Sequence, residues 1–128
     1  MLGRQEIHVS DEVLDKIYSD KDIRQEDGYS EKFFKYLGAE KVVSYDFNDY
    51  ENATYLHDFN LEIGSEHHEL YSVVFDGGSL EHIFNFPTAI YNLMKMVKVG
   101  GHLIIESPAN NYGGHGLYHL VRIYLYLY

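Results

Sequence analysis

The chain has 128 residues, which is enough for one domain with a single buried core and little beyond it. Its 20 acidic and 10 basic side chains give a formal net charge of -10, which disfavours non-specific attraction to the phosphates of nucleic acids. Because the chain has no cysteine, disulfides, thiolate metal ligands and a cysteine nucleophile are excluded.

No basic segment followed by an apolar one marks a signal peptide, and no run of about 18 apolar residues marks a membrane span. We therefore expect a cytoplasmic protein with no membrane association and no nucleic-acid partner, acting on a small molecule. Residues 1–128 are expected to form one α/β domain.

Two short helices are predicted in the first third of the chain. Ser10 suits the N-cap of a helix over Asp11–Tyr18, whose acidic residues lie at the positive end of the helix dipole. The charged residues 19–28 are typical of a solvated linker or an exposed helix. A second helix is predicted over residues 30–37, with Gly38 as its left-handed cap.

Three predicted strands follow, and each of them ends in an aspartate. They are residues 41–45 before Asp46, residues 53–57 before Asp58, and a strand from Tyr71 that ends at Asp76. The third begins a βαβ unit, because an amphipathic helix over residues 87–99, a Gly100-Gly101 stop and a second buried strand come next. Ligands of open α/β sheets bind beyond the carboxyl ends of the strands, so the site is expected there.

The last residues differ in composition from the rest of the chain. Residues 117–128 form an atypical tail, in which residues 123–128 alternate aliphatic and tyrosine side chains without a charge. A free strand of this kind would aggregate, so we expect it to be covered by the sheet edge or by a second copy of the chain in a homodimer. A truncated or misread coding region is a further explanation of this segment.

Two of the aspartates have residue types beside them that suit a nucleotide. A carboxylate at the position of Asp46, followed by Phe47, can accept hydrogen bonds from both hydroxyls of a ribose. Asp58 can accept from an exocyclic amine while Phe59 packs on a flat base. The alternative for both aspartates is that each caps its own turn.

Taken together, four segments resemble the core of the class I S-adenosylmethionine-dependent methyltransferases. They are Asp46 after its strand, His57-Asp58 after the next, residues 75–82 with Glu81-His82 at their end, and residues 97–108 around Gly100-Gly101. The resemblance covers residues 42–108 and rests on the order and spacing of all four segments. The glycine-rich first loop of that family is represented here by Gly3 alone, so the side chains of Arg4 and Gln5 must turn away from a bound cofactor.

The resemblance implies a role for each matching position. Asp46 with Phe47 would bind the cofactor ribose, and Asp58 with Phe59 would lie near the adenine. Gly3 would approach the cofactor from the first loop, and Asp76, Gly77 and Gly78 would lie against its methionine part. Glu81 and His82 would face the reacting methyl group, with His82 as a base and Glu81 either orienting it or contacting the substrate. The alternative for His82 is a helix-entry residue bonded to nearby backbone.

The glycine-rich loop after the last clear strand, residues 110–116, is a candidate substrate lid, and a plain flexible loop is its alternative. Its substrate-contacting candidates are Asn110, Asn111 and His115. His115 and His119, with His67 and His68, raise the possibility of a metal site. A spacing of four without a nearby third ligand is weak evidence, so no metal ligand is predicted.

The sequence thus predicts a three-layer, Rossmann-like α/β domain with a mainly parallel sheet of about five strands, a truncated methyltransferase core. The function that follows is methyl transfer from S-adenosylmethionine to a small-molecule or carbohydrate-like acceptor. The competing hypothesis is a catalytically inactive methyltransferase-like fragment that acts as a binding or assembly module.

Overall fold

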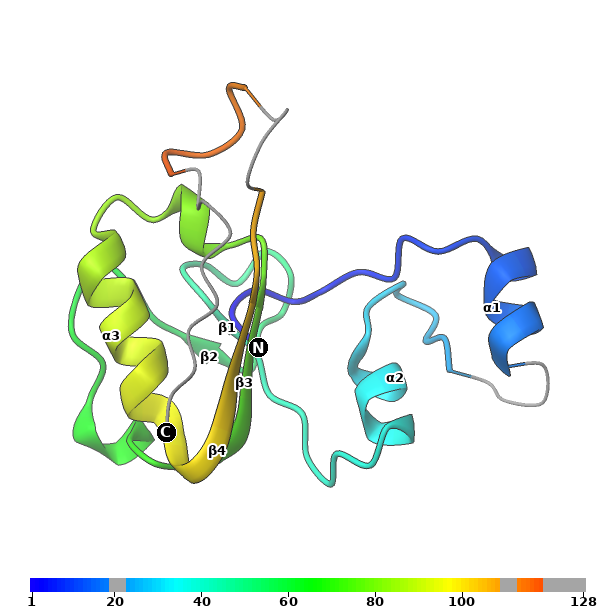
Figure 1. Ribbon diagram of the computed structural model, residues 1–128, viewed down its shortest axis with the longest axis horizontal. Helices are drawn as coiled ribbons and strands as arrows, with labels where there is room; N and C mark the ends of the chain where they lie inside the picture. The colour runs from blue at the N-terminus through cyan, green and yellow to red at the C-terminus, as the bar shows by residue number, and fades with distance from the viewer. Residues whose placement is uncertain (19–22, 109–112, 119–128) are drawn as a thin grey trace.

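The structure is a computed structural model that describes residues 1–18, 23–108 and 113–118 (Figure 1). In chain order its elements are α1 (Asp11–Tyr18), α2 (Glu31–Tyr36), β1 (Tyr45–Asp46), β2 (Tyr55–Leu56), the 3-10 turn η1 (Ser65–His67), β3 (Tyr71–Gly77), the 3-10 turn η2 (Leu80–His82), α3 (Phe86–Met96) and β4 (Val97–Glu106). Among these elements, no helix has both the length and the apolar character needed to cross a bilayer.

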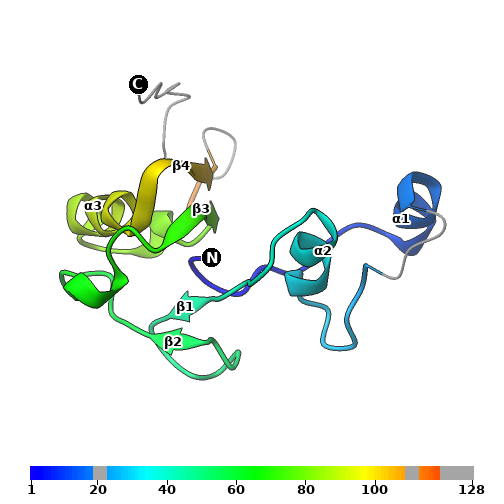
Figure 2. The same cartoon turned by 90° about the horizontal axis from the view of Figure 1, so that it is seen from below.

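The strands form two parallel pairs. β1 pairs with β2, and β3 pairs with β4 over most of its length. Between the pairs lies Leu2, which makes one parallel bridge to Tyr45 in β1 and another to Asp76 in β3. The five segments therefore lie side by side in the order β2, β1, Leu2, β3, β4. Figure 2 shows the four strands in this order.

The expected sheet of about five regular strands is replaced by these two short sheets of two strands each. β1 and β2 are only two residues long because side chains take the neighbouring ladder positions: Ser44 N donates to Thr54 Oγ1, and Thr54 N donates to Ser44 Oγ, both at 3.2 Å. Leu2 adds a single bridge on each side. The chain is thus a small α/β domain built on short parallel sheets.

The predicted βαβ unit is present, but its helix ends earlier than expected. α3 stops at Met96 and β4 begins at the next residue, whereas the sequence predicts helix to residue 99. The backbone N–H groups of Glu69 and Leu70 donate to the carbonyls of Lys95 and Met96. These bonds bring the start of β3 beside the end of the helix, and Val97 pairs with Tyr71. The helix therefore ends where strand pairing begins.

The hydrophobic core lies between the strands and α3 (Figure 2). It consists of Leu2, Val43, Tyr45, Phe59, Ile63, Val74, Leu80, Ala89, Leu93 and Met96. Asn92 is also fully buried there, where its Oδ1 accepts from Ile63 N and its Nδ2 donates to Leu61 O. α3 therefore holds both the sheet and the loop after β2.

The first two helices lie on the other side of the strands, with α1 the more distant (Figures 1 and 2). α1 has the predicted bounds, and α2 is one residue shorter at each end than predicted. Phe34 of α2 packs against Phe75 of β3 with ring centroids 5.6 Å apart. α1 instead contacts α2, through the rings of Tyr18 and Tyr36.

Candidate functional site

A cavity of about 430 Å³ opens at the carboxyl ends of the parallel strands. Its wall is formed by the N-terminal segment, by β1, by the residues that follow β1, β2 and β3, and by the end of η2 with the next residue. The lining residues are Leu2, Gly3, Tyr45, Asp46, Phe47, His57, Asp58, Phe59, Asn60, Gly78, Ser79, His82 and Ile83. A neighbouring hollow of about 320 Å³ shares Gly3, Asp46, Gly78 and Ser79 and adds Gly77. Many of the residues singled out in the sequence thus surround one space.

Gly3 occupies a position that favours glycine. Its φ angle is +65°, in the left-handed region, and a Cβ added there would lie 2.8 Å from Ser79 Oγ. Its backbone N–H donates to the carbonyl of Tyr45 at 2.8 Å, beside Asp46. The N-terminal loop therefore lies directly against the end of β1, although two helices separate them along the chain.

Arg4 and Gln5 are held by contacts of their own. Arg4 Nε lies 2.7 Å from Glu31 Oε1 and another guanidinium nitrogen lies 2.8 Å from Asp27 Oδ2. The hydrogen bond from Arg4 is the largest influence on the pKa of Asp27 and holds it below its usual value. Gln5 Nε2 donates to the carbonyl of Leu2 at 2.9 Å. The guanidinium thus ties the N-terminal loop to α2.

Asp46 and Asp58 both line the cavity, and both also bond within their own turns. Asp46 Oδ1 accepts from Asn48 N at 3.3 Å. Asp58 Oδ1 accepts from the backbone N–H of Asn60 at 2.9 Å and from its amide at 2.8 Å, and these bonds lower the pKa of Asp58. A carboxylate has two oxygens and about four acceptor sites, so turn capping and ligand binding are compatible at both positions.

The two phenylalanines of the cavity differ in exposure. Phe47 is 71% exposed, whereas Phe59 is only 4% exposed and packs edge-on against Tyr45 and His57. Phe59 is therefore mainly a core residue that reaches the wall of the cavity. Phe47 is the ring that is open to solvent at its mouth.

Asp76 is fully buried and shapes the turn after β3 instead of lining the cavity. Its Oδ1 accepts from Ser79 N at 3.0 Å and from Leu80 N at 3.3 Å. No hydrogen-bond donor in the described part of the chain reaches its Oδ2. Burial raises the pKa of Asp76 to about 6. Asp76 thus fixes the loop that carries Gly78 and Ser79 into the cavity wall.

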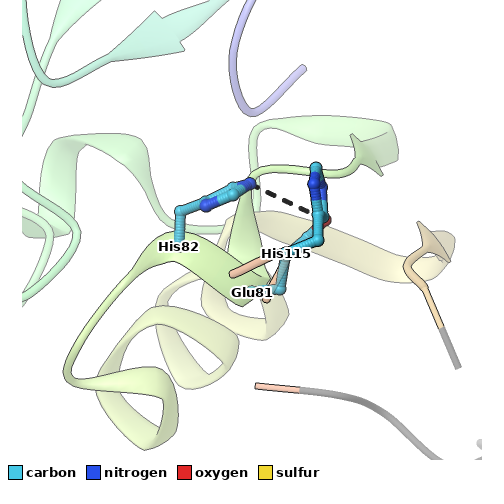
Figure 3. A group of neighbouring side chains, drawn as sticks. All are labelled: Glu81, His82 and His115. Carbon is cyan, nitrogen blue, oxygen red and sulfur yellow. Dashed lines mark ion pairs between the residues drawn. The ribbon is translucent and has the colours of Figure 1, made fainter. Parts of the chain in front are cut away.

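Glu81, His82 and His115 form a cluster at η2, as Figure 3 shows. The Glu81 side chain is 1% exposed, and its Oε1 lies 3.6 Å from Nε2 of His115 and 4.0 Å from Nε2 of His82. The two imidazole rings have centroids 5.0 Å apart. The structure therefore adds His115 to the pair that the sequence singles out, while His82 also lines the cavity.

The segment that carries His115 is fastened to η2 by its backbone. Leu117 N and Tyr118 N both donate to the carbonyl of Glu81, at 2.6 and 3.2 Å. Gly116 has a φ angle of +72°, and a Cβ there would lie 2.7 Å from Glu81 Cγ. The sequence gives no sign of this contact, because residues 81 and 115 are far apart in the chain. Its one local signal is the glycine that follows His115.

Other candidates lie elsewhere or outside the described part of the chain. Asn110, Asn111 and His119 are outside the described residues, so the proposed lid and the His115–His119 pairing have no structural account. His67 is part of the packing, since its Nδ1 lies 2.7 Å from the hydroxyl of Tyr45.

No protein-family model matches the chain, and no curated protein or solved structure matches it at a significant level.

Proposed function

We propose that the cavity binds S-adenosylmethionine and that the protein transfers its methyl group to a small-molecule or carbohydrate-like acceptor. The observation that carries this proposal is the convergence of Gly3, Asp46, Asp58 and Gly78 on one cavity at the carboxyl ends of parallel strands. Asp46 would bind the ribose and Asp58 the adenine amine, while Gly3 and Gly78 allow a close approach of the backbone.

The strand order supports this position for the site. β1 and β3 lie on opposite sides of Leu2, so the order reverses at the N-terminal segment. In doubly wound α/β folds the ligand binds in the crevice outside such a reversal, and the cavity lies there. The finer fold that we propose is accordingly a reduced, three-layer Rossmann-like core, with α3 on one face and α2 on the other.

His82 and Glu81 supply the chemistry that the acceptor needs. When bound, S-adenosylmethionine provides a methyl group that is already activated, so the chain mainly has to align the acceptor and exclude water. His82 lines the cavity, where its Nε2 would take up the proton of an acceptor hydroxyl or amine. Oε1 of Glu81, 4.0 Å away, would stabilise the resulting imidazolium.

Charge and exposed surface bear on the acceptor and on the competing function. A net charge of -10 favours a neutral or cationic small molecule over a polyanion. The competing function, a binding or assembly module without methyl transfer, is favoured by the outer face of the β3–β4 pair. There Val73 is 52% and Ile104 48% exposed. A homodimer would cover such a face; residues 119–128, through which we expect it to form, lie outside the described part of the chain.

Calorimetric titration with S-adenosylmethionine and with its demethylated product tests the proposal. We expect roughly micromolar binding of either compound. Asp46→Ala should weaken it roughly 10- to 150-fold, because a lost hydrogen bond to a charged group costs about 1.5 to 3 kcal/mol. Asp49→Ala is the matched control, since Asp49 is an exposed carboxylate of the same loop that does not line the cavity. Absence of heat with both compounds would refute the proposal and leave the assembly module.

A further inference from the structure

We propose that Glu81, His82 and His115 bind a divalent transition-metal ion, with Zn²⁺ as the preferred ion. Each side chain offers one ligand atom, and these atoms all lie within 4.8 Å of one another (Figure 3). The site goes beyond the proposed methyl transfer and does not depend on it, because the ligand atoms belong to this chain and no cofactor contributes to them.

Oε1 of Glu81 is the first observation that points to a cation. The Glu81 side chain is almost completely buried, and no hydrogen-bond donor among the described residues reaches Oε1. A buried carboxylate oxygen without a donor costs free energy, so native structures supply such an atom with a partner. Two imidazole nitrogens flank this oxygen, and a cation shared by the three groups would satisfy it.

The distances are close to those of a coordinated ion. Zinc bonds to nitrogen and oxygen are about 2.0–2.1 Å long, so tetrahedral ligand atoms lie about 3.3 Å from one another. Oε1 of Glu81 lies 3.6 Å from Nε2 of His115 and 4.0 Å from Nε2 of His82. The two histidine side chains are each 51% exposed and therefore have room to close the remaining gap by rotation.

The surrounding contacts hold the ligands in place. Oε2 of Glu81 accepts a hydrogen bond from the Ser107 hydroxyl at 3.4 Å, which orients the carboxylate. The segment of His115 is bound to η2 through Leu117 N, and the Tyr118 hydroxyl donates to the carbonyl of Phe84, just after η2, at 2.7 Å. The carboxylate of Glu81 and the backbone of the His115 segment are thus fixed beside each other.

The type of ligand selects the ion. Two imidazoles and one carboxylate suit Zn²⁺, whereas Mg²⁺ and Ca²⁺ are bound mainly by oxygen ligands. Three protein ligands leave a fourth position for water, and His82 places the ion at the wall of the cavity. Because His82 would supply one of the ligand atoms, an ion bound there would compete with the proposed role of His82 as a base.

Titration of the metal-free full-length chain with Zn²⁺ tests the site, with Co²⁺ as a spectroscopic probe of its geometry. We expect one ion per chain and the intense visible absorption of tetrahedral Co²⁺. His115→Ala and Glu81→Gln should each weaken Zn²⁺ binding at least about 100-fold, since loss of a supporting group alone costs 10- to 100-fold. His8→Ala is the matched control, because His8 and Glu6 lie at the same 3.6 Å separation, but both are exposed.

The outcomes separate clearly. Stoichiometric binding that is lost in His115→Ala and kept in His8→Ala supports the site, and circular dichroism shows whether each variant is folded. Since the His115 side chain is half exposed, its alanine variant tests the proposal even if Glu81→Gln unfolds. The proposal would be overturned if the wild type bound no Zn²⁺ or if His115→Ala bound it equally well. Displacement of Zn²⁺ by a modest concentration of Mg²⁺ would overturn it too. The titration contains no adenosyl compound, so its result is independent of cofactor binding.

Discussion

The two faces of the strands bury very different amounts of apolar surface. On the inner face, Val74 of β3 is 3% exposed and packs with Leu93 and Met96 of α3, which are 1% and 2% exposed. On the outer face, the ring of Phe75 contacts Phe34 of α2, and Val73 of β3 is 52% exposed. Hydrophobic burial therefore stabilises the inner face far more than the outer one.

The candidate site contains residues from both faces of the strands. Because the two faces bury different amounts of apolar surface, different contacts support the two parts of the site. Asp76, Glu81 and His82 lie in β3 and η2, directly before α3, and rest on the inner core. Gly3 lies in the N-terminal loop, whose side-chain links to α2 are the charged contacts of Arg4. Both parts of the site thus touch the core, but in the described part of the chain only the N-terminal part is also linked to α2 by charged side chains.

The largest expected effect on stability comes from a substitution that removes packing on the inner face. Leu93→Ala should lower the free energy of unfolding by about 2–5 kcal/mol, because it removes a fully buried side chain and leaves a cavity. Phe34→Ala on the outer face should cost less than about 2 kcal/mol, since its ring is only partly buried. Urea unfolding followed by circular dichroism measures both. Equal losses would show that the two faces contribute alike.

The next effect concerns the buried carboxyl group of the inner face. Burial raises the pKa of Asp76 from 3.8 to about 6, so the folded protein holds more protons than the unfolded chain between these values. The contribution of Asp76 to stability is therefore complete below about pH 4 and is lost as the pH rises through 6. It amounts to at most about 3 kcal/mol.

Asp76→Asn removes this dependence while keeping an oxygen that accepts from Ser79 N and Leu80 N. Between pH 4 and 7, the stability of the variant relative to the wild type should rise by up to about 3 kcal/mol. Urea midpoints measured across this range test the sign. Parallel pH profiles for the two proteins would contradict the argument.

The sequence predicts the elements whose stability is local or strongly patterned. The bounds of α1 are those predicted from Ser10 and the acidic first turn, and the βαβ unit follows from two apolar strands around an amphipathic helix. The order of the chain also predicts that Asp46 and Asp58 come after parallel strands, and both line the cavity. Hydrophobic periodicity and turn residues are local features of the sequence, so they predict these elements even though distant contacts are unknown.

What the sequence does not predict depends on contacts between distant residues. The exchange of side-chain hydrogen bonds between Ser44 and Thr54 shortens β1 and β2, and nothing in either segment indicates that pairing. Asn92 interrupts an apolar stripe, yet it is fully buried because the loop after β2 provides its partners. The meeting of Glu81 with His115 likewise depends on how the last described segment folds back over η2.

The smallest expected effect is on the outer side, where charge replaces packing. Arg4→Lys keeps the charge but loses the planar fork that reaches Glu31 and Asp27, so we expect it to cost about 1 kcal/mol at low salt. This loss should shrink in 0.5 M NaCl, since screening weakens the wild-type contacts, whereas the loss in Leu93→Ala should not. Glu62→Gln is the control, because the Glu62 carboxylate is 78% exposed at its 3.9 Å pair with Lys95 and should contribute little to stability. A salt-independent loss in Arg4→Lys would mean that the outer side is held by packing, as the inner one is.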